Sequence, residues 1–272
     1  MYLLTDYLTY GETIMVYKSL LSLVIIMMLQ VGCSNPALNR KETGFKGMNQ
    51  LTETEKDEGW ELLFDGMTAN GWRGINQEDF PQSGWFIANG ELGVDAVDGG
   101  ESTNGGDIIT LEKYSDFELK FQWRMETKGG NSGLKYFVIG GLSDNDKHGE
   151  GLEFQILDDA NHPWMIQGKM TPGDYYTAGG LYELYEPKGK KLSPLGEYND
   201  CRIISKGSHV EHWLNGVKVL EYERGSKDFK RRVQLSKFKD IENFGQAKEG
   251  HILLQDHGSK VYFRNIKIKV LR

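Results

Sequence analysis

The stretch from Phe117 to Met125 alternates strictly between apolar and polar side chains, and this alternation constrains the fold more than any other part of the chain. The apolar members are Phe117, Leu119, Phe121, Trp123 and Met125, and the polar members are Glu118, Lys120, Gln122 and Arg124. Successive side chains of a strand point to opposite faces of a sheet. The pattern therefore predicts a strand with one buried and one solvated face.

Similar runs recur along the chain and are separated by glycine-rich turns. We expect further strands over Leu134–Ile139, Leu152–Leu157, Cys201–Lys206, His209–Leu214, Val217–Tyr222, His251–Gln255 and Lys260–Leu271. Gly129–Gly133 is predicted to be a turn, and Asn215-Gly216 is a strong hairpin signal. No helix-period run of useful length is found beyond a short turn near residues 238–244. So many short strands predict an all-β sandwich or barrel over residues 59–272.

The first 33 residues are interpreted as an export signal. Lys18 precedes a short apolar run, SLLSLVIIMMLQV, which ends at Gly32-Cys33. The run is too short for a comfortable bilayer span, and its layout is typical of a secretory signal. The acidic residues before Met15 suggest that Met15 is the true start. A small residue before a cysteine resembles a bacterial lipoprotein signal, with Cys33 as the lipidated residue.

This interpretation predicts an exported protein of the bacterial cell envelope, in the periplasm or at the cell surface, with a membrane anchor. Residues 34–58 are polar, lack apolar periodicity and are predicted to be a tether. Cys201 is the only cysteine besides Cys33, so we expect no disulfide in the domain and interpret Cys201 as a small buried hydrophobic side chain.

The charge of the chain argues against a nucleic acid as partner. The formal net charge is -7 and the pI is about 5.5, whereas a nucleic-acid backbone is bound by a basic stripe. The densest basic run is KDFKRR, residues 227–232, which we interpret as a solvated turn.

Six motifs, in order along the domain, resemble one known family. GWELLFDG (59–66) followed by NGW (70–72) resembles the opening of the 3-keto-disaccharide hydrolase domain family. The later motifs are NSG (131–133), EFQILD (153–158), GEYN (196–199) with HWLNG (212–216), GHILLQDHG (250–258) and FRNI (263–266). The resemblance implies a concanavalin-like jelly roll of two antiparallel sheets. It also implies activity on sugars oxidised at carbon 3, for which cleavage by elimination has been proposed.

A ketone at carbon 3 acidifies the proton on carbon 2. A base removes this proton, and the group on carbon 1 then leaves by β-elimination, which requires a base, a stabiliser of the enolate oxygen and an acid for the leaving group. Glu153 and His257 are the candidate acid/base pair. Glu153 lies on the non-core face of its predicted strand, and an imidazole titrates near neutral pH. Asp256-His257-Gly258 would also suit a simple connection between strands.

Seven further residues are candidates for substrate binding. Gln155 shares the face of Glu153, and Lys135 and Arg124 alternate away from apolar neighbours. Arg264 belongs to the FRNI motif, Asp158 ends a strand, and Tyr182 and Trp164 in loops offer rings for stacking on a sugar. His212 alternates with apolar residues and is interpreted as a core histidine.

A divalent cation is left open as a ligand. Asp158, Asp159, Asp256 and His257 offer suitable donors, but their spacing matches no metal motif. The two-carboxylate mechanism of ordinary glycosidases is disfavoured, because Gln155 stands where a second acid would be needed.

Two alternatives to an enzyme stay open, a non-catalytic carbohydrate-binding module and a surface scaffold, because a fold alone does not fix function. Glu153, Gln155, Lys135 and His257 in one concave pocket would favour an enzyme. A flat aromatic platform would favour a binding module, and a featureless face would favour a scaffold.

Overall fold

The computed structural model describes residues 47–97, 105–140 and 149–271. The predicted signal segment, Cys33 and the first part of the predicted tether lie outside this described part. Within it, no helix is long and apolar enough to cross a bilayer.

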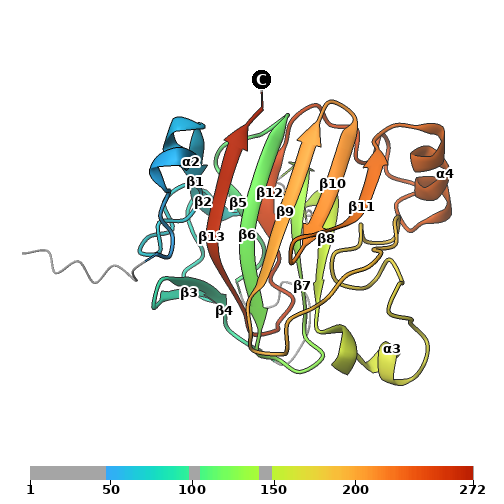
Figure 1. Cartoon of the computed structure of the whole chain (residues 1–272), viewed down its shortest axis with the longest axis horizontal. Coiled ribbons are helices and arrows are strands. Elements are labelled where there is room, and N and C mark those ends of the chain that lie inside the picture. The colour runs from blue at the N-terminus through green and yellow to red at the C-terminus, as the bar shows by residue number, and fades with distance from the viewer. Residues whose placement is uncertain (1–46, 98–104, 141–148, 272) are drawn as a thin grey trace, which may run out of the picture. The chain divides into compact units, whose positions relative to one another are not determined.

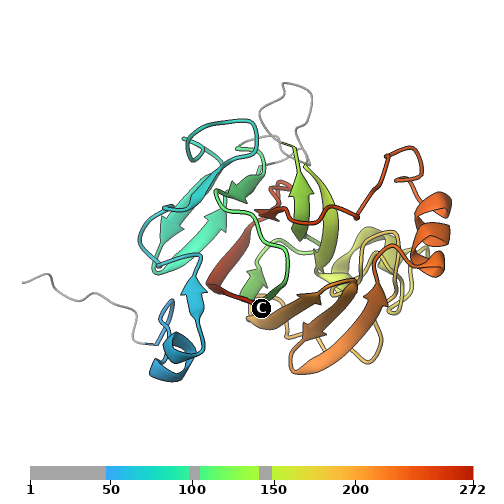
Figure 2. The same ribbon diagram turned by 90° about the horizontal axis from the view of Figure 1, so that it is seen from above.

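Two antiparallel sheets pack face to face as a jelly-roll sandwich, in the part of the chain that the structure describes (Figures 1 and 2). The larger sheet has eight strands in the order β11-β10-β9-β6-β13-β4-β3, with β1 paired to β13. The smaller sheet has five strands in the order β2-β5-β12-β7-β8. The larger sheet contains β1 (Trp60–Leu62), β3 (Trp85–Ala88), β4 (Glu91–Val94), β6 (Phe117–Met125), β9 (Asn199–Lys206), β10 (His209–Leu214), β11 (Val217–Glu223) and β13 (Val261–Val270). The smaller sheet contains β2 (Trp72–Gly74), β5 (Ile108–Thr110), β7 (Asn131–Ile139), β8 (Glu150–Leu157) and β12 (His251–Leu254).

The predicted strands are confirmed, with one change that affects the site. β6 spans the predicted residues, and its burial alternates along its whole length. β7, however, begins at Asn131, so the NSG motif belongs to the strand rather than to the preceding turn. Asn131, Gly133 and Lys135 consequently share one face of β7, because side chains alternate along a strand.

The core lies between the two sheets and is rich in aromatic side chains. Phe121 of β6 meets Phe154 of β8 edge to face, with ring centroids 5.5 Å apart. His212 is fully buried beside them, and its Nε2 lies 2.8 Å from the Tyr136 hydroxyl. Burial lowers the pKa of His212 to about 3. Cys201 is also buried, and burial raises the pKa of its thiol. The predicted core roles of His212 and Cys201 are confirmed.

The basic run at residues 227–232 was predicted to be a solvated turn, and this prediction is wrong. It forms most of α4 (Lys227–Leu235), which packs beside β11 (Figure 1). Ser226 caps the first turn, since its side chain accepts a hydrogen bond from the Phe229 backbone amide. Phe229 and Val233, four residues apart, are buried. The helix is amphipathic, and its charges occupy the solvent side.

The predicted tether is wrong for its last part. α2 (Glu53–Asp57) begins with a capping box formed by Thr52 and Glu55. Glu55 pairs with Lys267 of β13, and the Asn49 amide donates to the Asn265 side chain at 2.6 Å. The folded unit therefore extends at least to residue 47. Two other short helices, η1 (Asp159–Asn161) and α3 (Pro163–Ile166), follow β8.

Candidate active site

A cavity of about 310 Å³ opens on the outer face of the smaller sheet, and strands β7 and β8 form its floor. Lys135 of β7 is directly opposite Glu153 of β8 in the antiparallel register, so the two side chains lie on the same face. Both line the cavity. Lys135 is 7% exposed, and its Nζ lies 3.4 Å from the Gly149 carbonyl oxygen. The floor thus places the Lys135 ammonium beside the Glu153 carboxylate, under a cavity large enough for a small ligand.

The carboxylate of Glu153 leans across the sheet over Gly133. A Cβ atom on residue 133 would lie 2.6 Å from Oε1 and 3.0 Å from Cδ of Glu153. These distances are too short for any real side chain, so the glycine leaves the space that the carboxylate occupies. The glycine of the NSG motif therefore serves the position of Glu153 rather than a turn.

His257 lines the same cavity from the segment that follows β12. The neighbouring Asp256 fixes this segment, because its fully buried carboxylate accepts hydrogen bonds from the backbone amides of Gly105, Gly106 and Gly258. Its own backbone amide donates to Asp107 at 2.9 Å. The predicted acid/base pair, Glu153 and His257, is brought together in one cavity although the two residues lie in different motifs.

Asn131 and Gln255 also line the cavity, and sequence reasoning had not proposed either as a site residue. The Asn131 Oδ1 atom is buried and has no hydrogen-bond partner among the described residues. A buried acceptor without a partner is costly, so it is a natural contact for a hydroxyl of a ligand. The signal for Asn131 was present in the sequence, since it is two residues before Gly133 in the NSG motif.

One wall of the cavity is apolar and comes from the loop between α4 and β12. Phe238, Ile241 and Phe244 line it. The Phe238 and Phe244 rings are stacked, with centroids 4.0 Å apart and planes 8° from parallel. Sequence reasoning expected only a short turn here and assigned it no role. The aromatic spacing within residues 238–244 was the available signal.

Tyr182, a predicted sugar-stacking residue, lies in the cavity lining. The Lys237 ammonium lies 4.4 Å from its ring centroid, and Tyr176 meets it at 5.3 Å with planes 64° apart. Trp164 does not line this cavity. Trp164 belongs to α3 and is 47% exposed. Its ring meets that of Tyr176 edge to face, with the ring centroids 5.6 Å apart. Tyr182 is therefore already contacted by Lys237 and Tyr176, and the Tyr176 ring separates it from Trp164.

Gln155 shares the face of Glu153, as predicted, but it lies behind the cavity rather than in its lining. It is 2% exposed, and its Nε2 donates to the Tyr176 carbonyl at 3.0 Å. Gln155 therefore holds the loop that carries Tyr176 against β8. Its Oε1 is buried and has no hydrogen-bond partner in the described part of the chain.

Arg124 and Arg264 were expected to contact the substrate, and the structure places both on the other sheet. Arg124 of β6 pairs with Glu91 at 3.2 Å, and its guanidinium carbon lies 3.7 Å from the Tyr262 ring centroid. Arg264 of β13 stacks on Tyr198 at 3.5 Å. Neither lines the cavity around Glu153. Alternation correctly assigned each arginine to the polar face of its strand, but it gives no information on which sheet the strand belongs to.

Three of the four possible metal donors, Asp158, Asp159 and Asp256, are engaged by other groups of the protein. Asp158 accepts hydrogen bonds from the Gly129 amide and the Asn161 side chain, both at 2.8 Å. Asp159 forms a buried ion pair with Lys190 at 2.6 Å. Asp158 is thus part of a turn and does not line the cavity around Glu153.

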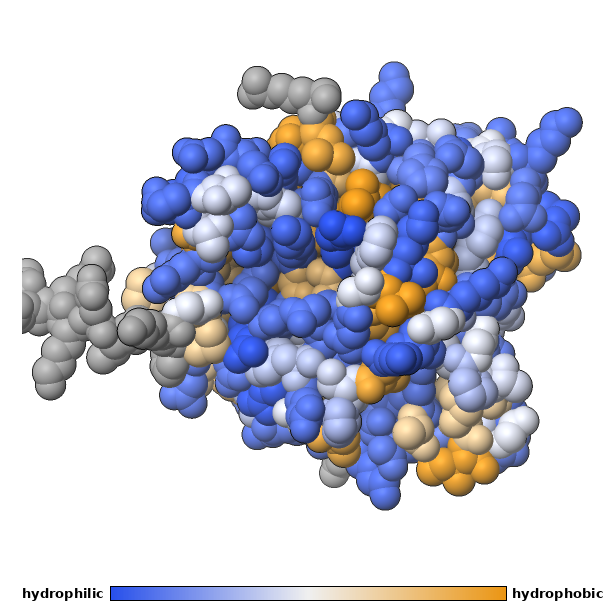
Figure 3. Space-filling view, in the orientation of Figure 1, coloured by the Kyte–Doolittle hydropathy of each residue, from blue (hydrophilic) through white to orange (hydrophobic). Residues whose placement is uncertain are grey.

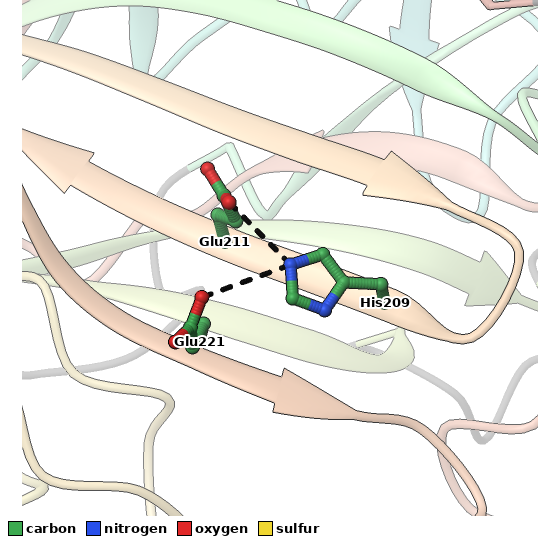
Figure 4. A group of neighbouring side chains, drawn as sticks. All are labelled: His209, Glu211 and Glu221. Atoms are coloured by element: carbon green, nitrogen blue, oxygen red, sulfur yellow. Dashed lines mark hydrogen bonds and ion pairs between the residues drawn. The ribbon is translucent and has the colours of Figure 1, made fainter.

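A different group, His209, Glu211 and Glu221, lies close enough together to share a metal ion (Figure 4). These side chains project from the β10–β11 hairpin, away from the cavity. The Lys218 ammonium already contacts both carboxylates, with its Nζ 2.5 Å from Glu221 and 3.3 Å from Glu211.

The outer face of the larger sheet, which faces the viewer in Figures 1 and 3, is mostly hydrophilic. A groove of about 510 Å³ lies there, lined by Lys120, Arg202, Trp213 and Lys267 among others. Its charged side chains contact groups of the protein itself. The Arg202 guanidinium covers Trp213 at 4.2 Å, and Lys267 pairs with Glu55.

Comparison with known proteins places these residues in a family. Residues 59–269 match the model of the 3-keto-alpha-glucoside-1,2-lyase-like domain. The chain is 34% identical over 245 residues to the 3-keto-disaccharide hydrolase of Bacteroides thetaiotaomicron, covering 82% of each protein.

Solved structures agree with this result. A putative glycosyl hydrolase from Parabacteroides distasonis has 38% identity and a TM-score of 0.71, covering 83% of this chain and 100% of the other. A second putative glycosyl hydrolase from the same species has 26% identity and a TM-score of 0.51, covering 74% of this chain and all of the other. The matched residues include Asn131, Glu153, Gln255 and His257, which line the cavity. The chain belongs to the 3-keto-alpha-glucoside-1,2-lyase-like family.

Proposed function

We propose that this protein cleaves the glycosidic bond of 3-keto-glycosides by elimination followed by hydration. The observation that supports this most directly is the placement of Glu153, Lys135 and His257 around one cavity. Membership of the family and the names of its relatives support a carbohydrate substrate.

The reaction needs no covalent nucleophile. A base takes the proton from carbon 2, and the electrons form an enediolate stabilised at the oxygen on carbon 3. The enediolate then expels the group on carbon 1, which leaves as an alcohol after it receives a proton. Water adds across the resulting double bond, so that one glycoside and one water give a 3-keto sugar and an alcohol.

Glu153 and His257 supply the two proton transfers in this proposal, and Lys135 stabilises the enediolate. The Lys135 ammonium is a cation in a sheltered site, where a charge acts more strongly on a developing anion than it does in water. The buried Asn131 Oδ1 accepts a hydrogen bond from a hydroxyl of the sugar. Gly133 leaves the space that the Glu153 carboxylate occupies.

The test compares a 3-keto-disaccharide with its unoxidised parent, and the released sugar is measured by mass spectrometry. We expect release from the ketone alone, and a fall of at least about 10²-fold in Glu153→Gln and His257→Asn. Release from both compounds at similar rates would exclude an elimination mechanism.

Exchange in D₂O separates the two proton-transfer roles. The variant that lacks the base loses deuterium incorporation at carbon 2 of a 3-keto sugar, measured by NMR above the rate without enzyme. The variant that lacks the acid keeps this exchange but releases the alcohol slowly. If both variants exchange as fast as the unmodified protein, neither residue is the base.

A non-catalytic carbohydrate-binding module is the second candidate. The aromatic rings of Tyr182, Tyr176 and Trp164 favour it, since they extend from the cavity to the surface. Binding of glycans without release of sugar from any ketone would support this alternative.

We also propose that the protein is exported and anchored through a lipid on Cys33. The apolar run that ends at Gly32-Cys33 supports this. Metabolic labelling with a radioactive fatty acid is expected to mark the protein and to fail in Cys33→Ser. Equal labelling of both proteins would contradict the anchor.

A further inference from the structure

The cavity is divided between two chemistries, and each comes from a different part of the fold. The sheet floor and the segment after β12 contribute polar groups, including Asn131, Lys135, Glu153 and His257. The loop between α4 and β12 contributes Lys237, whose ammonium lies 4.4 Å from the Tyr182 ring centroid, and three apolar side chains, Phe238, Ile241 and Phe244. These three side chains carry no hydrogen-bond donor or acceptor.

A sugar ring carrying a ketone suits the polar floor, because each hydroxyl can find a partner there. With the sugar ring on the floor, the loop is the part of the lining that remains for the group on carbon 1. A second sugar placed against these three side chains would lose water from its hydroxyls without gaining a partner from them, which is unfavourable. An apolar group placed there gains from burial in proportion to its area.

The rings of the cavity are arranged in a way that disfavours simple stacking of a sugar on an aromatic platform. Phe238 and Phe244 cover one another's faces at 4.0 Å. Tyr182 has the Lys237 ammonium 4.4 Å from its centroid and Tyr176 beside it. The exposed edge of the Phe238–Phe244 stack and the side chain of Ile241 together form a wall suited to an apolar ligand.

We infer that the leaving group of the preferred substrate is apolar or aromatic, so that the protein acts on 3-keto-glucosides of hydrophobic alcohols in preference to those of polar alcohols. This inference rests on the proposed function for the reaction itself. It adds the class of aglycone, and it names residues 238–244 as the segment that selects it.

The experiment uses two 3-keto-α-glucosides whose alcohols have similar acidity, one of 2-phenylethanol and one of ethylene glycol. Matching the acidity removes the effect of the leaving group on the chemical step. We expect kcat/KM to be at least about 10-fold higher for the phenylethyl compound, because burial of the ring stabilises the bound state. A ratio near one would overturn the inference while leaving the proposed function intact.

Two variants locate the selectivity. Phe238→Ala is expected to reduce the phenylethyl-to-hydroxyethyl ratio by at least about 5-fold, and Ile241→Thr, which keeps the branched shape but adds a hydroxyl, should reduce it in the same direction. Leu235→Ser is the matched control, because Leu235 is an apolar residue that is 77% exposed, belongs to the neighbouring helix end and does not line the cavity. If Phe238→Ala lowers both rates equally, the ring contacts the sugar and the inference is wrong.

A binding measurement decides the question even if neither ketone is cleaved. Calorimetric titration of the Glu153→Gln protein with the two unoxidised glucosides is expected to give a Kd at least about 10-fold lower for the phenylethyl compound, with a negative heat-capacity change. Absence of cleavage together with this preference would reject the proposed reaction but keep the apolar subsite. Equal affinities would reject the subsite.

Discussion

The Glu153 carboxylate occupies the space that a side chain on residue 133 would fill, with 2.6 Å between its Oε1 and an ideal Cβ at Gly133. The backbone of Gly133 is not in the left-handed region that requires glycine. Space for the carboxylate, not backbone conformation, therefore explains the glycine at this position.

Gly133→Ala is expected to lower kcat/KM by about 10²-fold, because displacement of a reacting group by about 1 Å has effects of this size. The free energy of unfolding should change by less than about 1 kcal/mol, since the atom that must move is the end of a flexible side chain. Steady-state kinetics and urea denaturation measure the two effects. Gly173→Ala is the control, because its Cβ meets nothing within 4 Å. Full activity of Gly133→Ala would contradict a catalytic Glu153.

His212 makes folding sensitive to acid. Burial lowers its pKa in the folded protein to about 3, whereas an unfolded histidine titrates near pH 6.5. Between these values the unfolded chain binds a proton that the folded chain does not, so His212 destabilises the fold by about 1.4 kcal/mol for each pH unit below about 6.5. Its effect is absent above that pH.

Urea denaturation of the unmodified protein and of His212→Gln from pH 7.5 to pH 4.5 tests this prediction. The variant is expected to be less stable at pH 7.5, because it loses the 2.8 Å contact with Tyr136. The difference between the two proteins should shrink as the pH falls. A difference independent of pH would show that the pKa of His212 is the same in the folded and the unfolded protein.

Lys190 and Asp159 form a buried ion pair that joins η1 to the loop that precedes β9. Their side chains are 9% and 10% exposed, and Asp159 Oδ1 also accepts a hydrogen bond from the Ala178 amide at 2.9 Å. Lys190→Met leaves a buried carboxylate without its cation, so we expect a loss of about 3–5 kcal/mol in the free energy of unfolding. Combination with Asp159→Asn should recover a large part of the loss, measured by thermal or urea denaturation. Additive effects of the two changes would contradict a direct pair.

Cys201 is expected to resist thiol reagents until the protein unfolds. Its Sγ is buried and accepts a hydrogen bond from the Trp123 indole at 3.2 Å, and burial raises the pKa of the thiol. A chromogenic disulfide reagent applied to the Cys33→Ser chain should give no colour in buffer and one equivalent in denaturant. Rapid reaction in buffer would contradict the burial of Cys201.

The strands from Phe117 onward were predictable from apolar runs between turns, and β6 covers the residues that alternation indicated. Strands β1 to β5 were not predicted, because each is only three or four residues long and gives a weak pattern. α4 was missed because Lys, Arg and Asp surround Phe229 and Val233, and two buried residues one helical turn apart give a weak signal within a charged run. The folding of residues 47–58 was missed for a different reason. Its contacts, such as Asn49 with Asn265, join residues 216 positions apart.

The candidate site was predictable only in part. Alternation and motif placed Glu153 and Lys135 on one face of adjacent strands, and the antiparallel register agrees. The same reasoning failed for Arg124, because alternation assigns a side chain to a face but not to a sheet. The apolar wall at Phe238 was missed because the aromatic spacing within residues 238–244 indicates a short turn but not which strands it covers, and the wall forms only where this loop meets the residues of β7 and β8 that line the cavity.

The floor of the cavity comes from β7 and β8, and its apolar wall comes from the loop between α4 and β12. This separation affects how the substrate specificity of such a protein can change. Residues 238–244 lie outside the strands that carry Glu153 and Lys135, so under the proposal a substitution in this loop alters which alcohols are accepted and leaves the pairing of β7 and β8 in place. Proteins with the same reaction can therefore differ in substrate specificity through changes in one short loop. For the same reason, randomising that loop is a way to seek new substrates without changing the residues that carry out the reaction.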